Sequence, residues 1–139
     1  MYAHGLLAPV LALCAWTYVM WVWMYAMRIP AMRKAKTDLQ EAERTGVFDL
    51  PRAAERPTEN YNHLHEQPTV FYAVALTAQI GGASDAINIG LAWAYVALRI
   101  VHSFIQATAN IIIVRFWVFV AASLVLAALL ARTILTLLS

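Results

Sequence analysis

Two short sets of polar residues could do chemistry in this sequence, because their spacing places each set on one face of a helix. The first set is spaced three, four and four residues apart and consists of Arg99, His102, Gln106 and Asn110. The second set is spaced three residues apart and consists of Asn60, His63 and Glu66. Residues three or four positions apart lie on the same side of an α-helix. The sequence therefore predicts two polar helix faces that carry guanidinium, imidazole, amide and carboxylate groups.

The charges of these residues and of the nearby Arg115 do not balance. Arg99 and Arg115 carry two fixed positive charges, whereas Glu66 carries one negative charge. Arginine does not lose its proton on burial, so an excess of buried guanidinium groups needs an anion. The planar guanidinium group also binds carboxylates through two parallel hydrogen bonds. We therefore expect a small anionic ligand at this site.

Simpler interpretations of the same residues stay open. Arg115 could extend from a helix start to the lipid head groups, and Glu66 and Arg99 could form a structural bridge between two helices. His102 could be a hydrogen-bonded interior histidine, and His63 could lie at the membrane interface without a functional role. These residues lack the spacing of a recognised zinc site, and the chain has a single cysteine, so we expect no metal.

The composition places these polar residues in a membrane protein. Hydrophobic residues make up 62% of the 139 residues and charged residues 13%, with a mean hydropathy of +0.62. A soluble domain is about 45–50% apolar and about 25% charged. Most charged residues lie in the segment 28–56, where acids and bases are mixed. This pattern excludes a soluble enzyme, a disordered chain and a nucleic-acid-binding surface.

Four segments are candidates for helices that cross the membrane, which need about 20 apolar residues each. They are the predicted helices 6–28, 58–82, 86–107 and 111–138. The second reaches this length only if it begins before its apolar part, near Thr58 or Asn60. A hydrophilic connector, 29–57, joins the first two helices, and the other two connections are tight. We predict an all-α membrane protein with one domain, residues 1–139, built as an up-down four-helix bundle.

The distribution of basic residues predicts the orientation of this bundle. Seven of the ten basic residues lie in or next to the first connector, which places that connector in the cytoplasm and both termini on the other side. Arg99 then lies about 18 Å along its helix from the outer boundary, level with the other polar residues. The prediction is a polar pocket that opens to the cytoplasm. Arg132, at the opposite end, is expected to extend to the head groups, and Trp16 and Trp21 are expected to face lipid.

Both polar sets resemble motifs of the MAPEG family, the membrane-associated proteins in eicosanoid and glutathione metabolism. The block Asn60-Tyr61-Asn62-His63-Leu64-His65-Glu66-Gln67-Pro68 resembles the family's Asn and Glu followed by Pro at the start of the second helix. The block Arg99-Ile100-Val101-His102-Ser103 resembles the Arg-x-x-His-(Ser/Thr) signature of the third helix. Arg115 is similar to the arginine of the fourth helix. The resemblance covers nearly the whole chain.

This resemblance implies a homotrimer that binds glutathione between neighbouring subunits at the cytoplasmic side. Glu66, Arg99 and His102 match the glutathione-contacting positions of the family. Arg115 matches the arginine proposed to stabilise the glutathione thiolate, which makes it the expected catalytic residue. Asn60, His63, Gln106 and Asn110 complete the expected ligand-binding set.

The chain departs from the family pattern at three positions. His63 stands where many members have asparagine, Gln106 stands where well-studied members have tyrosine, and Glu59 stands where they often have arginine. The pattern is closest to bacterial members of the family, which implies the bacterial inner membrane.

Two classes of function follow from the sequence. The first is a glutathione-dependent transferase or peroxidase that acts on lipophilic electrophiles or lipid hydroperoxides. The alternative is a non-catalytic lipid-binding or scaffold protein, because the family includes an activating protein without enzymatic activity and Gln106 replaces the tyrosine. A channel or transporter subunit is disfavoured, because the four predicted spans are unbroken and show no inverted repeat.

Overall fold

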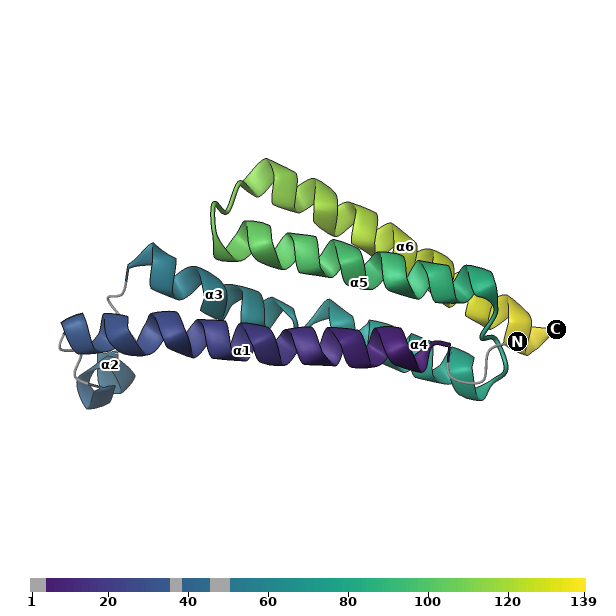
Figure 1. Cartoon of the computed structure of the whole chain (residues 1–139), viewed down its shortest axis with the longest axis horizontal. Coiled ribbons are helices and arrows are strands. Elements are labelled where there is room, and N and C mark those ends of the chain that lie inside the picture. Colours follow the sequence, from purple (N-terminus) through teal and green to yellow (C-terminus); the bar gives the residue numbers. More distant parts are fainter. Residues whose placement is uncertain (1–4, 36–38, 46–50) are drawn as a thin grey trace.

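A computed structural model describes residues 5–35, 39–45 and 51–139, and these residues form six helices and no strand (Figure 1). The helices are α1 (Leu7–Ala35), α2 (Leu39–Thr45), α3 (Arg52–His63), α4 (Gln67–Ile80), α5 (Ala86–Ala107) and α6 (Ile112–Leu138). Helices α5 and α6 pair as an antiparallel hairpin, and α1 runs along α3 and α4 (Figure 1). Helix α3 also packs against α5, and α4 packs against α6.

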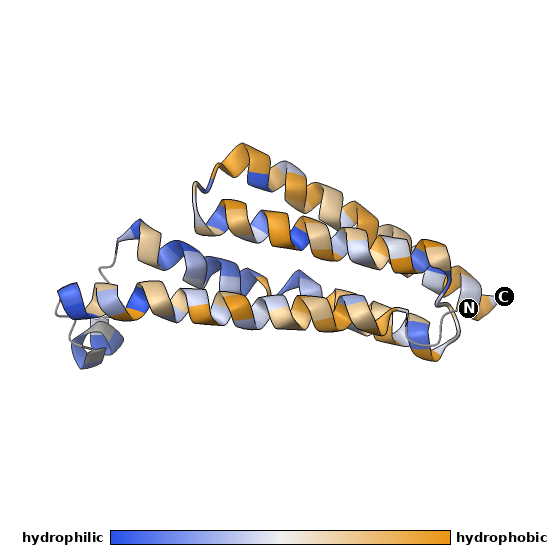
Figure 2. Cartoon of the chain, viewed as in Figure 1, coloured by the Kyte–Doolittle hydropathy of each residue, from blue (hydrophilic) through white to orange (hydrophobic). Residues whose placement is uncertain are grey.

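Three of the helices are long and apolar enough to cross a membrane. These candidate spans are Leu7–Lys34, Ala86–Ala107 and Ile112–Leu138, and Figure 2 shows apolar residues along most of their surface. Helix α4 has 14 residues and is about 21 Å long, which is less than the roughly 30 Å of a bilayer core. The chain is therefore an all-helical membrane protein with three candidate spans, and the four-helix bundle and the trimer stay predictions.

The predicted helix 58–82 is divided into two helices, and the expectation that it is unbroken was wrong. Helix α3 begins earlier than predicted and ends at His63, and α4 begins at Gln67. The N–H groups of His65 and Glu66 bond only three residues back, which forms a tight turn between the two helices. The cause is Pro68, because a proline ring within a helix clashes with the carbonyl group four residues earlier, which is that of Leu64. The break therefore lies where the polar residues of the second set are concentrated.

The predicted connector 29–57 is largely helical where the structure describes it, and the spacing of its charged residues over 31–44 favours a solvated helix. Helix α1 continues past the predicted end at residue 28 to Ala35, with Pro30 inside it. Residues 31–35 are alanine, methionine, arginine and lysine, which are good helix formers, so the helix continues into the hydrophilic segment. Helix α2 and the first part of α3 occupy the rest of the connector that the structure describes, and residues 36–38 and 46–50 lie outside it.

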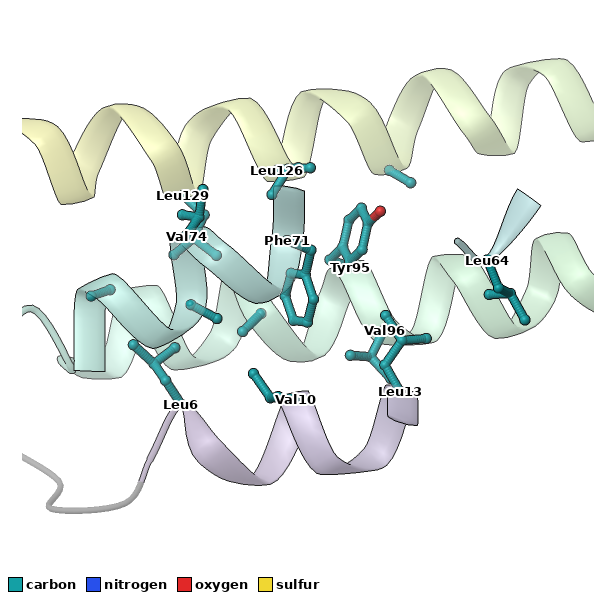
Figure 3. Close-up of a cluster of buried hydrophobic side chains, with 14 of the residues drawn as sticks. Leu6, Val10, Leu13, Leu64, Phe71, Val74, Tyr95, Val96, Leu126 and Leu129 are labelled. Carbon is teal, nitrogen blue, oxygen red and sulfur yellow. The ribbon is translucent and has the colours of Figure 1, made fainter. Parts of the chain in front are cut away.

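The apolar core lies where α1, α4, α5 and α6 meet (Figure 3). Phe71 of α4 stacks on Tyr95 of α5 with ring centroids 4.6 Å apart, and both side chains are fully buried. Gln67, in the first turn of α4, accepts a hydrogen bond from the Tyr95 hydroxyl at 3.1 Å and donates one to the Ser123 hydroxyl of α6 at 2.8 Å. The start of α4 is thus fixed to both helices of the α5–α6 hairpin.

Trp16 does not face lipid as predicted. Its indole N–H donates a hydrogen bond of 3.0 Å to the hydroxyl of the buried Ser103, and its ring packs on Phe104. A buried indole N–H needs an acceptor, and Ser103 supplies one inside the bundle. Trp21, one and a half turns further along α1, is exposed as predicted. Helix α1 is therefore oriented by a polar contact with α5 as well as by apolar packing.

Candidate functional site

A seam of buried polar side chains lies between α3 and α5. We use the term polar seam for Asn60 and His63 of α3 together with Arg99, His102 and Gln106 of α5. Asn60, Arg99, His102 and Gln106 are all at most 3% exposed. Each helix brings its residues to the seam through spacings of three and four, as the sequence predicts. Most of the polar residues of the two sets therefore meet at one interface.

Many polar atoms of the seam have no hydrogen-bond partner among the described residues. They are both amide atoms of Asn60, Nε and Nη1 of Arg99, Nδ1 of His102 and Oε1 of Gln106. A buried polar atom without a partner costs about 1–3 kcal/mol, and native proteins contain few of them. A concentration of such atoms in one seam indicates a place where additional polar partners bind.

Arg99 is held by only one nitrogen atom. Its Nη2 lies 3.4 Å from the carbonyl oxygen of His63, the last residue of α3. A positive charge at a helix C-terminus is favourable, because the free carbonyl groups there carry partial negative charge. The two other nitrogen atoms of the guanidinium group have no partner among the described residues. The arginine is thus oriented by α3 but is not neutralised.

The structural bridge between Glu66 and Arg99, one of the simpler interpretations of the sequence, is not formed. No ion pair joins them in the part of the chain that the structure describes, and the Glu66 side chain is 68% exposed. Its carboxylate instead lies 3.9 Å from Nδ1 of His63. Glu66 stands in the turn between α3 and α4, immediately before the first residue of α4, and this turn carries its side chain outward. Arg99 therefore has no carboxylate partner among the residues that the structure describes.

A cavity of about 220 Å³ opens beside the seam, between α3, α5 and α6. It is lined by His63, His102, Ile112, Arg115, Phe116 and Phe119. The lining combines two histidines from α3 and α5 with Arg115 and three apolar residues of α6. The cavity can therefore accept a ligand that is anionic on one side and apolar on the other.

Asn110 supports the cavity from the turn between α5 and α6. Its side-chain oxygen accepts a hydrogen bond of 2.7 Å from Nη1 of Arg115. The backbone of Asn110 has a φ of 50°, which is a left-handed conformation that asparagine tolerates better than most residues. Arg115 is consequently held at the cavity, and it does not simply extend to the lipid head groups.

Three polar residues make contacts that the sequence did not predict, and two of them, Arg56 and Gln67, lie in or beside this region. Arg56 lies four residues before Asn60 and donates a hydrogen bond of 2.6 Å to the carbonyl oxygen of Thr108, and its Nε is buried without a partner among the described residues. The spacing of four was the signal that could have identified Arg56. Gln67 fixes the start of α4. In the sequence it is a polar residue directly before an apolar run, and this position gives no indication of its partners.

The third residue is Arg132, which does not extend to the head groups as predicted. It donates hydrogen bonds to the Asp85 carboxylate at 3.0 Å and to the Asn88 side-chain oxygen at 2.7 Å. Asp85 precedes α5 and Arg132 lies near the end of α6, so the two opposite charges lie at the same end of the hairpin. This arrangement was the sequence signal that could have identified the ion pair. This arginine is neutralised within the protein.

The outer face of α3 is separate from the seam. Arg52 binds both carboxylate oxygens of Glu59, at 2.7 and 3.2 Å, and also Glu55 at 3.0 Å. The hydrogen bonds to Glu59 and then to Glu55 raise the pKa of Arg52 above its ordinary value. Glu59 is thus engaged on the solvated face of the helix. No group of three or more histidine, cysteine or acidic residues that could hold a metal occurs among the described residues.

Long apolar helices around an arginine–histidine seam near one end define a helical integral membrane protein with a polar site. Residues 6–135 match the model of the MAPEG family, and the chain belongs to this family. The match covers the candidate spans from residue 7 through most of α6 and includes every residue of the polar seam. No curated protein and no solved structure matches the chain.

Proposed function

We propose that this protein is a glutathione-dependent transferase or peroxidase that acts on lipophilic electrophiles or lipid hydroperoxides. The observation that carries the proposal is the state of Arg99, which is 1% exposed and has two nitrogen atoms without a hydrogen-bond partner among the described residues. A buried charge without a partner is strongly unfavourable. An anionic ligand that binds this guanidinium group offsets that cost.

The residues of the site fit the chemical groups of glutathione, which are two carboxylates, one ammonium group and a thiol. Arg99 and Arg115 offer guanidinium groups for anions, and Glu66 offers a carboxylate for the ammonium group. A thiol beside a guanidinium group ionises more readily, because the positive charge stabilises the thiolate. Arg115 is the arginine that lines the cavity, so we assign this role to it.

The size of the cavity supports a site that extends beyond one chain. Its volume of about 220 Å³ is below the roughly 300–1,000 Å³ typical of ligand pockets. The exposed carboxylate of Glu66 also lies outside the cavity lining. We therefore propose that a neighbouring subunit of a homotrimer supplies the remaining wall, as the family resemblance implies.

The apolar wall supports a lipophilic second substrate. Ile112 and Phe116 are more than half exposed at the start of α6, and both line the cavity. A molecule dissolved in the bilayer can approach Arg115 along this surface without passing through water. We further propose that the protein lies in a bacterial inner membrane, with the α3 end of the bundle towards the cytoplasm and both termini on the other side.

A second candidate function is a non-catalytic lipid-binding or scaffold protein of the same fold. The observation in its favour is Gln106, which is buried in the seam and presents an amide and not a hydroxyl group to a bound thiol. Under this proposal the cavity binds the anionic head group of a lipid, and no thiol is bound.

The test uses the purified protein in detergent micelles or lipid nanodiscs. We expect glutathione to raise the apparent melting temperature in a saturable way, because a ligand that binds only the folded state stabilises it. We also expect conjugation of a lipophilic electrophile that depends on glutathione. Arg115→Ala should lose turnover while its oligomeric state on size-exclusion chromatography is unchanged.

The outcomes separate the two candidates. A co-purified lipid without glutathione binding supports the scaffold function. Neither binding nor turnover with glutathione in the wild-type protein contradicts the enzyme proposal. Wild-type turnover in Arg115→Ala would show that this arginine does not stabilise the thiolate.

A further inference from the structure

We infer that His63 is a general base that accepts the proton of the bound thiol, and that Glu66 orients its imidazole ring. This inference rests on the proposed function, because it assigns a proton acceptor to the same site.

The geometry places His63 at the centre of the site. It is the last residue of α3, and its ring lines the cavity together with His102 and Arg115. Nδ1 of His63 faces the Glu66 carboxylate at 3.9 Å. This orientation leaves Nε2, on the opposite side of the ring, available to a ligand. His63 thus lines the cavity and lies near a carboxylate at more than hydrogen-bond distance, and such pairs often tighten only when the substrate binds.

The backbone around His63 is fixed by two further contacts. Its carbonyl oxygen accepts a hydrogen bond from the Glu66 N–H at 3.1 Å and from Nη2 of Arg99 at 3.4 Å. The first contact closes the turn between α3 and α4, and this turn brings Glu66 beside the ring. The interruption of the helix therefore creates the pair of His63 and Glu66.

Charged and titratable groups from three elements face His63. Arg99 and His102 approach from α5, with the His102 ring centroid 6.2 Å from that of His63, and Arg115 approaches from α6. Glu66 lies on the side of α4. The positive charges of the arginines stabilise a thiolate in the cavity, but they destabilise a protonated imidazole. The negative charges of the Glu66 carboxylate and of the thiolate offset this destabilisation of the imidazolium.

The proposed step is a proton transfer without any change of oxidation state. The S–H bond of the thiol breaks, its electron pair stays on sulfur, and the proton forms a new N–H bond at Nε2 of His63. The thiolate is then stabilised by Arg115 and attacks the electrophilic atom of the second substrate. The protonated imidazole returns its proton to the leaving group or to water.

His102 is less suited to this role. It is 3% exposed, its Nδ1 has no partner among the described residues, and no ion pair joins it to a carboxylate in that part of the chain. Protonation of His102 would place another charge beside Arg99 without compensation. His63, by contrast, is partly exposed and can exchange its proton with solvent.

The experiment compares His63→Asn with His65→Asn in the full-length protein. His65 is a matched control, because it is exposed in the same turn, its Nδ1 bonds the carbonyl oxygen of Tyr61, and it does not line the cavity. Binding of glutathione is measured by calorimetry, ionisation of the bound thiol by its thiolate ultraviolet absorbance, and kcat/KM as a function of pH.

We expect His63→Asn to bind glutathione within a fewfold of the wild-type affinity but to lose most of the thiolate signal near neutral pH. Its kcat/KM should fall by about 10²-fold, as is typical for loss of a general base, and the low-pH limb of its profile should move to higher pH. Glu66→Gln should weaken glutathione binding through the loss of its carboxylate for the ammonium group, and in the glutathione-bound protein it should also reduce the thiolate signal, by less than His63→Asn does. His65→Asn should behave like the wild-type protein.

Two results would contradict the inference, and each is distinct from a failure of the proposed function. A His63→Asn variant that keeps both the thiolate signal and the pH profile shows that His63 takes no proton. Equal losses in His63→Asn and His65→Asn show a structural effect of the turn. Absence of glutathione binding in the wild-type protein refutes the proposed function, and with it the role of His63.

Discussion

Replacement of Arg99 by methionine should leave the protein at least as stable as the wild type but unable to respond to glutathione. Methionine is an unbranched apolar side chain that fills irregular space well, so it can occupy most of the volume of the arginine stem. Arg99 is 1% exposed, and two nitrogen atoms of its guanidinium group have no partner among the described residues. The substitution removes this uncompensated buried charge.

The expected change in the free energy of unfolding follows from two opposing effects. The single contact to the His63 carbonyl oxygen is 3.4 Å long, so its loss costs at most about 1 kcal/mol. Replacing buried ionic groups by apolar side chains of similar volume has often been neutral or stabilising, by about 1–4 kcal/mol. We therefore expect Arg99→Met to change the stability by between about 0 and +3 kcal/mol in the absence of ligand.

Thermal unfolding in one detergent, with and without glutathione, measures both parts of this prediction. The wild-type protein should gain about 2.7 kcal/mol at a ligand concentration 100 times Kd, and Arg99→Met should gain nothing. Arg132→Met is the matched control, because Arg132 is satisfied by Asp85 and Asn88. It should destabilise the protein by about 1 kcal/mol, since this site is partly exposed, and it should keep the full response to glutathione.

The reasoning would be refuted by a specific result. If Arg99→Met destabilises the unliganded protein by several kcal/mol, the guanidinium group is a structural brace at the end of α3. In that case the guanidinium group would not be an uncompensated charge that binds an anionic ligand.

Two further substitutions test the packing that positions the site. Gln67→Leu should lower the free energy of unfolding by about 2 kcal/mol, because it leaves the hydroxyl of the buried Tyr95 without its acceptor, and chemical denaturation in detergent measures this loss. Trp16→Phe should cost about 1 kcal/mol through the hydrogen bond of its indole N–H, whereas Trp21→Phe on the exposed face of α1 should change stability by less than about 0.5 kcal/mol. Equal effects of the two tryptophan substitutions would show that the indole contact inside the bundle contributes nothing.

The helical class and the polar faces were predictable because both depend on local periodicity. Spacings of three and four residues place Arg99, His102 and Gln106 on one side of α5 wherever the helix begins and ends. Polar groups within a membrane are costly, so this side had to face the protein interior. The structure buries all three residues at the interface with α3.

The interruption at residues 64–66 was missed because two signals compete there. The apolar run after Pro68 favours one long helix that crosses the membrane, whereas the proline ring excludes the carbonyl group of Leu64 from a regular helix. The steric effect determines the local backbone. As a consequence Glu66 points outward and lies beside His63, and the expected contact with Arg99 is not made.

Contacts between distant residues could not be read from the sequence at all. Trp16 and Ser103 are separated by 87 positions, and Arg132 and Asn88 by 44. Such pairs depend on how each helix is rotated about its axis, which the packing of the whole bundle determines. Spacing alone identifies which side of a helix is polar, but it does not identify the partner.

The contact of Arg132 with Asp85 has a consequence for the direction from which ligands arrive. Near one end of the α5–α6 hairpin the arginine is neutralised by a carboxylate, while at the other Arg99 and Arg115 have no acidic partner among the described residues. The guanidinium groups of the hairpin that lack an acidic partner among the described residues therefore lie near one end, and this charge favours the binding of an anion at that end. A reactant with an anionic head group and an apolar tail would bind there through its head group. Its tail would remain among the acyl chains of the lipids.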